Sequence, residues 1–425
     1  MIVVCNYWTH PAPRWAADYL ASASAAVYFT GLGFPRDGGL VRIPLPGIIR
    51  REVERRLLPP ALTRTRVRSL AVTLTVASVL AQRLGKERLH VRLVRQVNLQ
   101  AQRRTIRYLR RNRKHITGVL ATASMSDRVV AYCAQNEIPT MLYLPLPHYD
   151  YAQSQLASLG TQRAGVPAYT NEHELNREMD LANGFLGGSS MVRESTIPWS
   201  PKPTIIHPPG IDGIEGIAPR LETVQIDAAA RAVRPLRIVY VGRAAPQKGL
   251  RYLFEAISSL ESERPVHLTI YSADAKLIRA EVARRSLQDR IWVKEALPRP
   301  LLLEALGSFD LFVLPSLYEG FALVLAEALA CGLPIVATSM TGASDIDLDQ
   351  RAGIVVPPGD RYALAAAITT LVEDDDLRAA YAAQARLVAA TLTWKQYAHD
   401  VGPELVAFFD ANDAKHSKNG AAVTA

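Results

Sequence analysis

The fold is decided by residues 310–338, which read Asp-Leu-Phe-Val-Leu-Pro-Ser-Leu-Tyr-Glu-Gly-Phe-Ala-Leu-Val-Leu-Ala-Glu-Ala-Leu-Ala-Cys-Gly-Leu-Pro-Ile-Val-Ala-Thr. The first apolar run, 311–314, does not alternate with polar residues, which is typical of a strand buried on both faces of a parallel sheet. A loop over 316–321, a helix over 322–331 and a second buried strand over 333–338 are predicted to follow. This strand–helix–strand unit should have the right-handed crossover that parallel strands of one sheet almost always have.

Two carboxylates in this unit do not suit a packing role. Glu319 follows the first strand at its carboxyl end, which is where open α/β sheets bind ligands. Gly320 lets a ligand approach the backbone, and the next helix directs unpaired N–H groups and its positive dipole end to the same place. Glu327 lies on an otherwise apolar helix, where burying a carboxylate without a partner is costly. The alternative, that Glu327 faces solvent on a surface helix, fits less well because its helical neighbours are apolar.

A second strand–loop–helix element spans residues 238–253. Gly242 permits a tight exit from the strand, and Gly249 precedes the helix. Arg243 and Lys248 lie in the loop between these glycines, where both can reach one anion. An arginine can hold two phosphate oxygens at once, and a lysine adds a mobile point charge. Taken alone, the two could equally be solvated loop cations, but together with the two glutamates they predict a phosphate site at the same sheet edge.

These two elements resemble motifs of the retaining family-4 glycosyltransferases. The spacing from Glu319 to Glu327, with Gly-Phe after the first glutamate, is similar to the family's glutamate pair. The Gly-Arg…Lys-Gly pattern around Arg243 and Lys248 is similar to the family's site for the donor diphosphate. The resemblance is specific over residues 236–360 and looser before them, where Trp-Thr-His-Pro replaces the family's glycine pair after the first strand.

The resemblance implies the GT-B architecture, an α/β fold with two Rossmann-like domains whose parallel sheets face each other across a cleft. It implies an N-terminal domain over 1–205 on the acceptor side and a C-terminal domain over 206–393 on the donor side. A crossover helix over 394–410 should return to brace the first domain, and the polar tail over 411–425 should be disordered. The stretch 213–234 has no firm periodicity and is predicted to be a linker or surface loop.

The activity implied by the resemblance is that of a retaining hexosyltransferase, which moves a sugar from a nucleotide diphosphate sugar to an acceptor. The acceptor would attack from the front face without an enzyme nucleophile, while Arg243 and Lys248 hold the leaving diphosphate. Glu319 would orient the sugar, and Glu327 would bind the ribose hydroxyls. The residues carried over are, for catalysis, Arg243, Lys248, Glu319 and His148 and, for donor binding, Gly242, Gly320, Phe321, Ala322, Glu327, Ala296 and Leu297.

The acceptor side of the predicted site offers two histidines. His148 follows a strand predicted over 140–146, as a histidine beside the sugar and the acceptor does in the family. His10 lies in the loop after the first strand, where the family has its glycines near the donor phosphate. Either could also be an ordinary loop histidine. The base and the sugar stay unassigned, because residues 271–275 and 341–345 depart from the family's motifs.

The formal net charge of +9 is concentrated in one segment. Residues 50–114, predicted to be mainly helical, hold nineteen Arg or Lys against three Glu. Nucleic-acid binding is not expected there, because base stacking needs aromatic side chains and Tyr108 is the only one. Two interpretations remain. The segment is either a solvated basic face or a docking surface for an anionic membrane that carries a lipid-linked or cell-surface glycan acceptor.

The three cysteines favour a reducing compartment. Cys5, Cys133 and Cys331 are far apart and offer neither a disulfide framework nor a metal-ligand spacing. No apolar stretch reaches the roughly 18 residues that span a bilayer, and the apolar start of the chain is too short for a signal peptide. We therefore expect a cytoplasmic protein that is peripheral on the inner face of the membrane.

No metal ion or other cofactor is expected. Asp345, Asp347 and Asp349 alternate like the Asp-x-Asp of metal-dependent transferases, but those enzymes have another fold, and alternation here favours a solvated loop. Arg243 and Lys248 can supply the positive charge that a metal would provide. Two other classes stay open, namely a sugar-nucleotide epimerase of the same fold and a non-catalytic sugar-nucleotide-binding protein.

Overall fold

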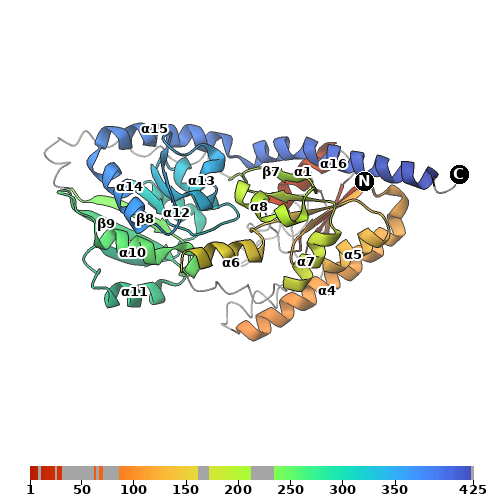
Figure 1. Ribbon diagram of the computed structural model, residues 1–425, viewed down its shortest axis with the longest axis horizontal. Coiled ribbons are helices and arrows are strands. Elements are labelled where there is room, and N and C mark those ends of the chain that lie inside the picture. Colours follow the sequence, from red (N-terminus) through yellow and green to blue (C-terminus); the bar gives the residue numbers. More distant parts are fainter. Residues whose placement is uncertain are drawn as a thin grey trace, which may run out of the picture.

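The computed structural model describes most of the chain, namely residues 1–7, 11–23, 26–30, 62–63, 67–69, 86–160, 172–211 and 234–422. His10 and most of the basic segment before residue 86 lie outside these ranges, as does nearly all of the predicted linker. Within the described residues the chain forms two lobes, each built on one sheet whose paired strands are all parallel (Figure 1). The predicted α/β fold with two Rossmann-like domains is confirmed.

The first sheet has the strand order β3-β2-β1-β4-β5-β6-β7. In chain order its strands are β1 (Ile2–Cys5), β2 (Ala26–Thr30), β3 (Val67–Ser69), β4 (Gly118–Thr122), β5 (Thr140–Leu144), β6 (Gly184–Gly187) and β7 (Thr204–Ile206). The helices of this lobe are α1 (Pro11–Ala23), α4 (Glu87–Asn112), α5 (Asp127–Gln135), α6 (Tyr149–Ser158), α7 (Glu172–Leu181) and α8 (Ser190–Ser195), with short 3-10 turns at Arg113–His115 and Ile197–Trp199. The predicted boundary between residues 205 and 206 falls inside β7.

Alternating residues of this sheet enter two separate core layers. Val3 and Cys5 pack with side chains of α4, α5 and α7, whereas Ile2 and Val4 pack with α1 and the last helix, α16 (Trp394–Ala422). Both faces are therefore covered, which explains why the strand sequences are apolar runs without alternation.

The second sheet has the order β10-β9-β8-β11-β12-β13. Its strands are β8 (Leu236–Val241), β9 (Val266–Ser272), β10 (Ile291–Glu295), β11 (Leu311–Leu314), β12 (Ile335–Thr338) and β13 (Gly353–Val356). Its helices are α10 (Leu250–Ser258), α11 (Ala275–Arg284), α12 (Arg299–Leu306), α13 (Leu323–Ala330), α14 (Arg361–Glu373) and α15 (Asp375–Thr391), with 3-10 turns at Pro246–Lys248, Ser339–Thr341 and Ser344–Ile346. The order reverses between β8 and β11, so the carboxyl ends of these two strands form the topological switch point of the sheet.

The C-terminal helix crosses back to the first lobe, as the resemblance implied. Figure 1 shows α16 continuing from α15 along the top of the first lobe beside α1. The rings of Trp15 and Trp394 stack with centroids 6.5 Å apart, and Phe409 packs over Gly118 of β4. The helix continues to Ala422, beyond the predicted end at residue 410, because the sequence after that point contains no proline and no glycine before residue 420. The prediction of a disordered tail from residue 411 is therefore wrong as far as Ala422.

The basic segment is not helical throughout. Residues Val67–Ser69 form the edge strand β3, which pairs in parallel with β2, so the prediction of a mainly helical segment is wrong at this point. A strand of three residues is too short to leave a periodic signal in the sequence. The later part of the segment forms α4, as predicted. Among the described helices, none is long and apolar enough to cross a membrane.

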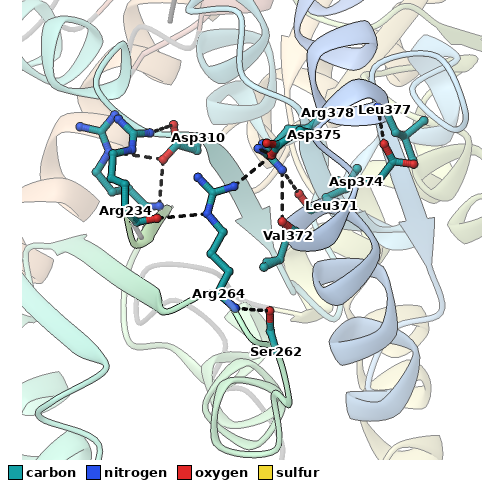
Figure 2. A network of polar contacts seen from close by, with 11 residues as sticks. Arg234, Ser262, Arg264, Asp310, Leu371, Val372, Asp374, Asp375, Leu377 and Arg378 are labelled. Carbon is teal, nitrogen blue, oxygen red and sulfur yellow. Dashed lines mark hydrogen bonds and ion pairs between the residues drawn. The ribbon is translucent and has the colours of Figure 1, made fainter. Parts of the chain in front are cut away.

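A polar network ties together the amino-terminal edge of the second sheet, opposite the switch point (Figure 2). Asp310 accepts hydrogen bonds from Arg234 Nη2 at 2.7 Å and from the N–H of Arg237 at 3.0 Å. Burial alone would raise the pKa of Asp310, but these arginines lower it below its usual value. Arg264 donates to Asp375 Oδ1 at 3.0 Å and to the carbonyl oxygen of Arg234 at 3.1 Å. The network thus holds the start of β8 against β11 and α15, which gives it a structural role.

The two lobes touch through α6, which Figure 1 shows between them. Ala152 and Leu156 of α6 and Met191 of α8 form an apolar cluster with Leu317 and Tyr318 from the loop after β11.

Candidate functional site

The loops that follow β8 and β11 meet at the switch point of the second sheet. Gly249 has a φ of +66°, in the left-handed region that favours glycine. A Cβ atom there would lie 1.9 Å from the carbonyl oxygen of Pro315. Only glycine therefore allows the loop after β8 to lie so close to the loop after β11.

Lys248 and Glu319 form an ion pair between these loops. The Nζ atom of Lys248 lies 2.5 Å from Oε1 of Glu319. The glutamate side chain is only 11% exposed, and such a carboxylate needs a cationic partner to offset its lost hydration. The structure thus brings together the residue predicted to hold the diphosphate and the residue predicted to hold the sugar.

Arg243 pairs with a different carboxylate. Its Nε donates to Oδ2 of Asp274 at 2.6 Å, and the same oxygen accepts the N–H of Ala244 at 2.9 Å. The hydrogen bond from Arg243 lowers the pKa of Asp274. Arg243 remains 68% exposed, so a ligand can reach its guanidinium. The sequence analysis did not assign Asp274 to the site, although a charged residue just after β9 was a signal that could have found it.

Glu327 also has a partner that the sequence analysis missed. The Nε of Arg299, the first residue of α12, donates to Glu327 Oε1 at 2.6 Å. The glutamate side chain is 14% exposed, so it neither faces bulk solvent nor lies buried without a counter-charge. The useful signal was the position of Arg299, two residues after Leu297 and at the carboxyl edge of the sheet.

Several backbone groups predicted to contact a ligand are used within the protein. Three of their N–H groups donate to backbone carbonyl oxygens: Gly242 to Tyr271 at 3.1 Å, Ala296 to Ser272 at 3.0 Å and Ala322 to Thr341 at 3.0 Å. The first two bonds extend the pairing of neighbouring strands, and the third fixes the start of α13. Leu297 is half-buried and packs against the second core. The N–H groups of these three residues are therefore engaged within the protein, and the roles of Gly242, Ala296, Leu297 and Ala322 in donor binding stay predictions.

The first lobe reaches the site through the loop after β5. A Cβ atom at Gly320 would lie 1.9 Å from the carbonyl oxygen of Pro145, and Phe321 lies beside Gly188. Leu146, next to Pro145, is an exposed large apolar residue. Pro145 and Leu146 of the first lobe therefore lie against Gly320, the residue after Glu319. This contact depends on how the lobes pack, and no sequence motif predicted it.

His148 is buried at the start of α6. Its Nδ1 accepts a hydrogen bond from the N–H of Asp150 at 3.3 Å, and its Nε2 lies 2.6 Å from Oδ1 of Asn176. The ring also packs against Trp199, with centroids 4.8 Å apart. Both ring nitrogens are therefore engaged inside the first lobe, where His148 caps the helix. Its role beside an acceptor stays a prediction.

The alternating aspartates of the loop after β12 point to different partners. Asp345 Oδ1 accepts the N–H of Ser190 in the first lobe at 2.8 Å, and burial raises the pKa of Asp345. Asp349 Oδ1 accepts the N–H of Val355 at 2.8 Å. Asp345 is half-buried between the lobes, so the expectation of a solvated loop is wrong for this residue.

Known proteins resemble part of the chain in sequence. Residues 235–374 match the family described as glycosyl transferases group 1. A D-inositol 3-phosphate glycosyltransferase of Xylanimonas cellulosilytica is 32% identical over 206 residues, which cover 45% of this chain and 48% of that protein. An alpha-maltose-1-phosphate synthase of Mycolicibacterium smegmatis is 31% identical over 177 residues, or 39% of this chain and 46% of that protein. The chain thus spans about half the length of these curated relatives.

The fold is shared over nearly the whole chain. The structure of Anabaena HepE in complex with UDP-glucose superposes with a TM-score of 0.62 and 17% identity, covering 96% of this chain and 99% of that one. At 17% identity this similarity establishes the architecture alone. The sequence match to the family covers residues 235–374 of the second lobe. Residues 235–374 of the second lobe therefore match a glycosyl transferases group 1 domain, within a chain that has the GT-B fold.

Proposed function

We propose that the chain is a retaining hexosyltransferase, which moves a sugar from a nucleotide diphosphate sugar to an acceptor. The observation that carries the proposal is the meeting of Lys248 and Glu319, 2.5 Å apart, at the switch point of the second sheet. Nucleotides bind at such switch points in open α/β sheets. The group 1 match and the likeness to a structure that holds UDP-glucose support the same assignment.

Each residue of the site has a role in this proposal. Lys248 and the exposed Arg243 stabilise the negative charge that develops on the departing diphosphate. Glu319 orients the sugar, and Glu327 accepts hydrogen bonds from the ribose. The acceptor oxygen bonds to the anomeric carbon on the face from which the diphosphate leaves, and the acceptor proton passes to the leaving phosphate oxygen. Two protein cations can balance the charge, so we expect no metal requirement.

The acceptor is proposed to be a lipid-linked or cell-surface glycan precursor, met at the inner face of an anionic membrane. The support is α4, whose sequence holds eight arginines against one glutamate. One side of the helix packs on the first lobe through Val97, Ala101 and Leu109, while Arg103 and Arg107 are exposed. A basic face on the outer edge of the first lobe would hold the enzyme where such an acceptor is found.

A donor screen tests the proposed function. Binding to the folded state raises the thermal midpoint by mass action, so the true donor should stand out in a panel of nucleotide sugars. The same donor, incubated with the protein and no acceptor, should be hydrolysed slowly to the nucleotide diphosphate. A changed sugar would identify an epimerase, and binding without any turnover would identify a sensor. Once an acceptor is known, the anomeric configuration of the first product, read by proton NMR, tests retention.

The screen has a matched pair of variants. Lys248→Met removes a cation from the proposed site, whereas Lys276→Met removes an exposed cation from α11. We expect the donor-induced shift to disappear in the first variant and to persist in the second.

A further inference from the structure

Arg299 joins two elements that both border the proposed nucleotide site. It is the first residue of α12 and follows the loop of Ala296 and Leu297. Its Nε donates to Oε1 of Glu327 on α13 at 2.6 Å. The position of Glu327 relative to that loop is therefore fixed by a charged hydrogen bond, the strongest kind available to a carboxylate.

The pairing leaves half of the carboxylate for another partner. Among the described residues, Glu327 accepts its hydrogen bond through Oε1, and no donor to Oε2 is found. The side chain keeps a small exposed surface, so a ligand hydroxyl can reach it. Glu319 has the same arrangement, with its own Oε1 held by Lys248. In both cases a cation orients a carboxylate whose second oxygen can accept a hydrogen bond.

Simple charge compensation is the competing explanation for Arg299. An exposed ion pair contributes little to stability, and compensation alone would have no effect on which ligand binds. If Arg299 orients Glu327, the preference among ligands should depend on Arg299, because a carboxylate on a long side chain must be held in one place to recognise a hydroxyl. The two explanations differ in what they predict for ligands that lack one hydroxyl.

We propose that Arg299 is a positioning residue that sets the preference for ribose: it holds Glu327 so that the second carboxylate oxygen accepts a ribose hydroxyl of the donor. The inference rests on the proposed function. It goes further because it assigns a residue outside the glutamate pair and names the part of the nucleotide that the residue selects.

The test compares ribose with deoxyribose. The ribonucleoside diphosphate that binds best among UDP, GDP and ADP is measured by calorimetry beside its 2′-deoxy and 3′-deoxy forms. The parent should prefer the ribose form over at least one deoxy form by about 10-fold to 100-fold, the scale of one hydrogen bond to a charged group. Arg299→Ala should reduce that ratio to within about 3-fold, and Arg299→Lys, which keeps a cation and a donor, should restore part of it.

The matched control is Arg284→Ala, which removes an arginine that also donates to a glutamate, Glu281, at 2.6 Å, but on the surface of α11. It should keep the parent's ratio. A ratio is unaffected by a loss of stability or of active protein that is common to both ligands. An Arg299→Ala variant that keeps the parent's ratio overturns the inference, as does a parent that binds nucleoside diphosphates without preferring ribose. A parent that binds no nucleoside diphosphate of any base overturns the proposed function as well.

Discussion

Lys248 Nζ and Glu319 Oε1 lie 2.5 Å apart, so the cation predicted to bind the diphosphate and the carboxylate predicted to bind the sugar hold each other. Two further ion pairs lie at this edge: Arg243 with Asp274 and Arg299 with Glu327, each at 2.6 Å. Three cations thus face three carboxylates. An entering diphosphate must displace a carboxylate from the cation that it pairs with. Removing one residue of an ion pair leaves the charge of the other uncompensated.

Replacing Lys248 with Met should therefore have two separable effects. Transfer should fall by about 10²-fold or more, the scale for losing one donor to a developing charge. Stability should fall by roughly 2 kcal/mol, because Glu319 is left as an unpaired, mostly buried carboxylate. Urea unfolding and initial transfer rates measure the two effects.

The double variant Lys248→Met/Glu319→Gln separates them further. Because it removes both charges, it should recover most of the stability while transfer stays low. A double variant that regains transfer would show that the lysine acts only by compensating Glu319.

Arg243 lends itself to a test of partner exchange. Arg243→Ala should also lower transfer by about 10²-fold, and combined with Lys248→Met the loss should be less than additive, because both act on one diphosphate. The variant leaves the Asp274 carboxylate beside the incoming phosphate. Arg243→Ala/Asp274→Asn should therefore bind the nucleoside diphosphate more tightly than Arg243→Ala alone, as calorimetry would show. Equal affinities would place Asp274 away from the ligand.

The role of His148 can be separated from that of the helix it caps. His148→Ala removes the cap of α6, which should cost about 1 kcal/mol of stability. It should impair transfer more than nucleotide diphosphate binding, because α6 belongs to the first lobe and packs against the loop of Glu319. His148→Asn keeps a capping side chain and should restore the stability but not the transfer, because it lacks the imidazole predicted to lie beside the acceptor. An Asn variant that regains both would limit His148 to capping the helix.

The fold could be predicted where burial of a strand requires a continuous apolar run in the sequence. The run over 311–314 is apolar because β11 is covered on both faces, and the strand has the bounds predicted from that run. Gly332, just after α13, has a φ of +72°, the left-handed conformation that glycine favours at the end of a helix. The strand β3 was missed because an edge strand of three residues is too short to show a periodic pattern of apolar and polar residues.

Two features of the site could be predicted from the sequence: its place at the carboxyl ends of strands, and the charged residues that lie there. The pairing of Lys248 with Glu319 joins two loops that share a sheet edge, which the sequence implied. The pairing of Asp274 with Arg243 and of Arg299 with Glu327 depends on side-chain conformations and on helix packing. The spacing of residues in the sequence does not predict either. The approach of Pro145 to Gly320 depends on contacts between the lobes, which arise from the tertiary fold.

A buried glutamate of the first lobe should make the stability of the protein depend on pH. Glu178 is fully buried and accepts hydrogen bonds from the N–H groups of Ser124 at 2.6 Å and Ser126 at 2.7 Å. Burial raises its pKa from the usual 4.5 to about 8. The folded state therefore holds a proton that the unfolded state has released between these values, and stability falls as the pH rises from about 4.5 to about 8, by at most about 1.4 kcal/mol per pH unit.

The variant Glu178→Gln isolates this contribution. Its side chain does not titrate, so the difference in unfolding free energy between parent and variant should shift against the parent from pH 5 to pH 8. Urea unfolding at several pH values gives that difference. A difference that stays constant would mean that the two N–H donors keep Glu178 ionised in the folded state throughout.

The exposed face of α4 provides the test of membrane attachment. Arg103, Arg107 and Arg111 follow one another at intervals of four residues, so they form one stripe, and all three are exposed. Figure 1 shows α4 along the lower side of the first lobe, opposite α16. Because each basic residue near an anionic surface contributes roughly 1 kcal/mol, changing all three to Gln should weaken binding by about 10²-fold.

The measurement is co-sedimentation with vesicles that contain an increasing share of phosphatidylserine, at low and high salt. The parent should bind anionic vesicles at low salt and leave them at high salt, since screening shortens the reach of surface charge. The control changes Arg251, Arg279 and Arg284, which are exposed on the second lobe, to Gln. It alters the net charge equally, so it should bind like the parent if α4 is the docking face. Equal recovery of the parent on neutral and anionic vesicles, or equal losses in both triple variants, would leave the basic face of α4 a solvated surface and remove the membrane from the proposed function.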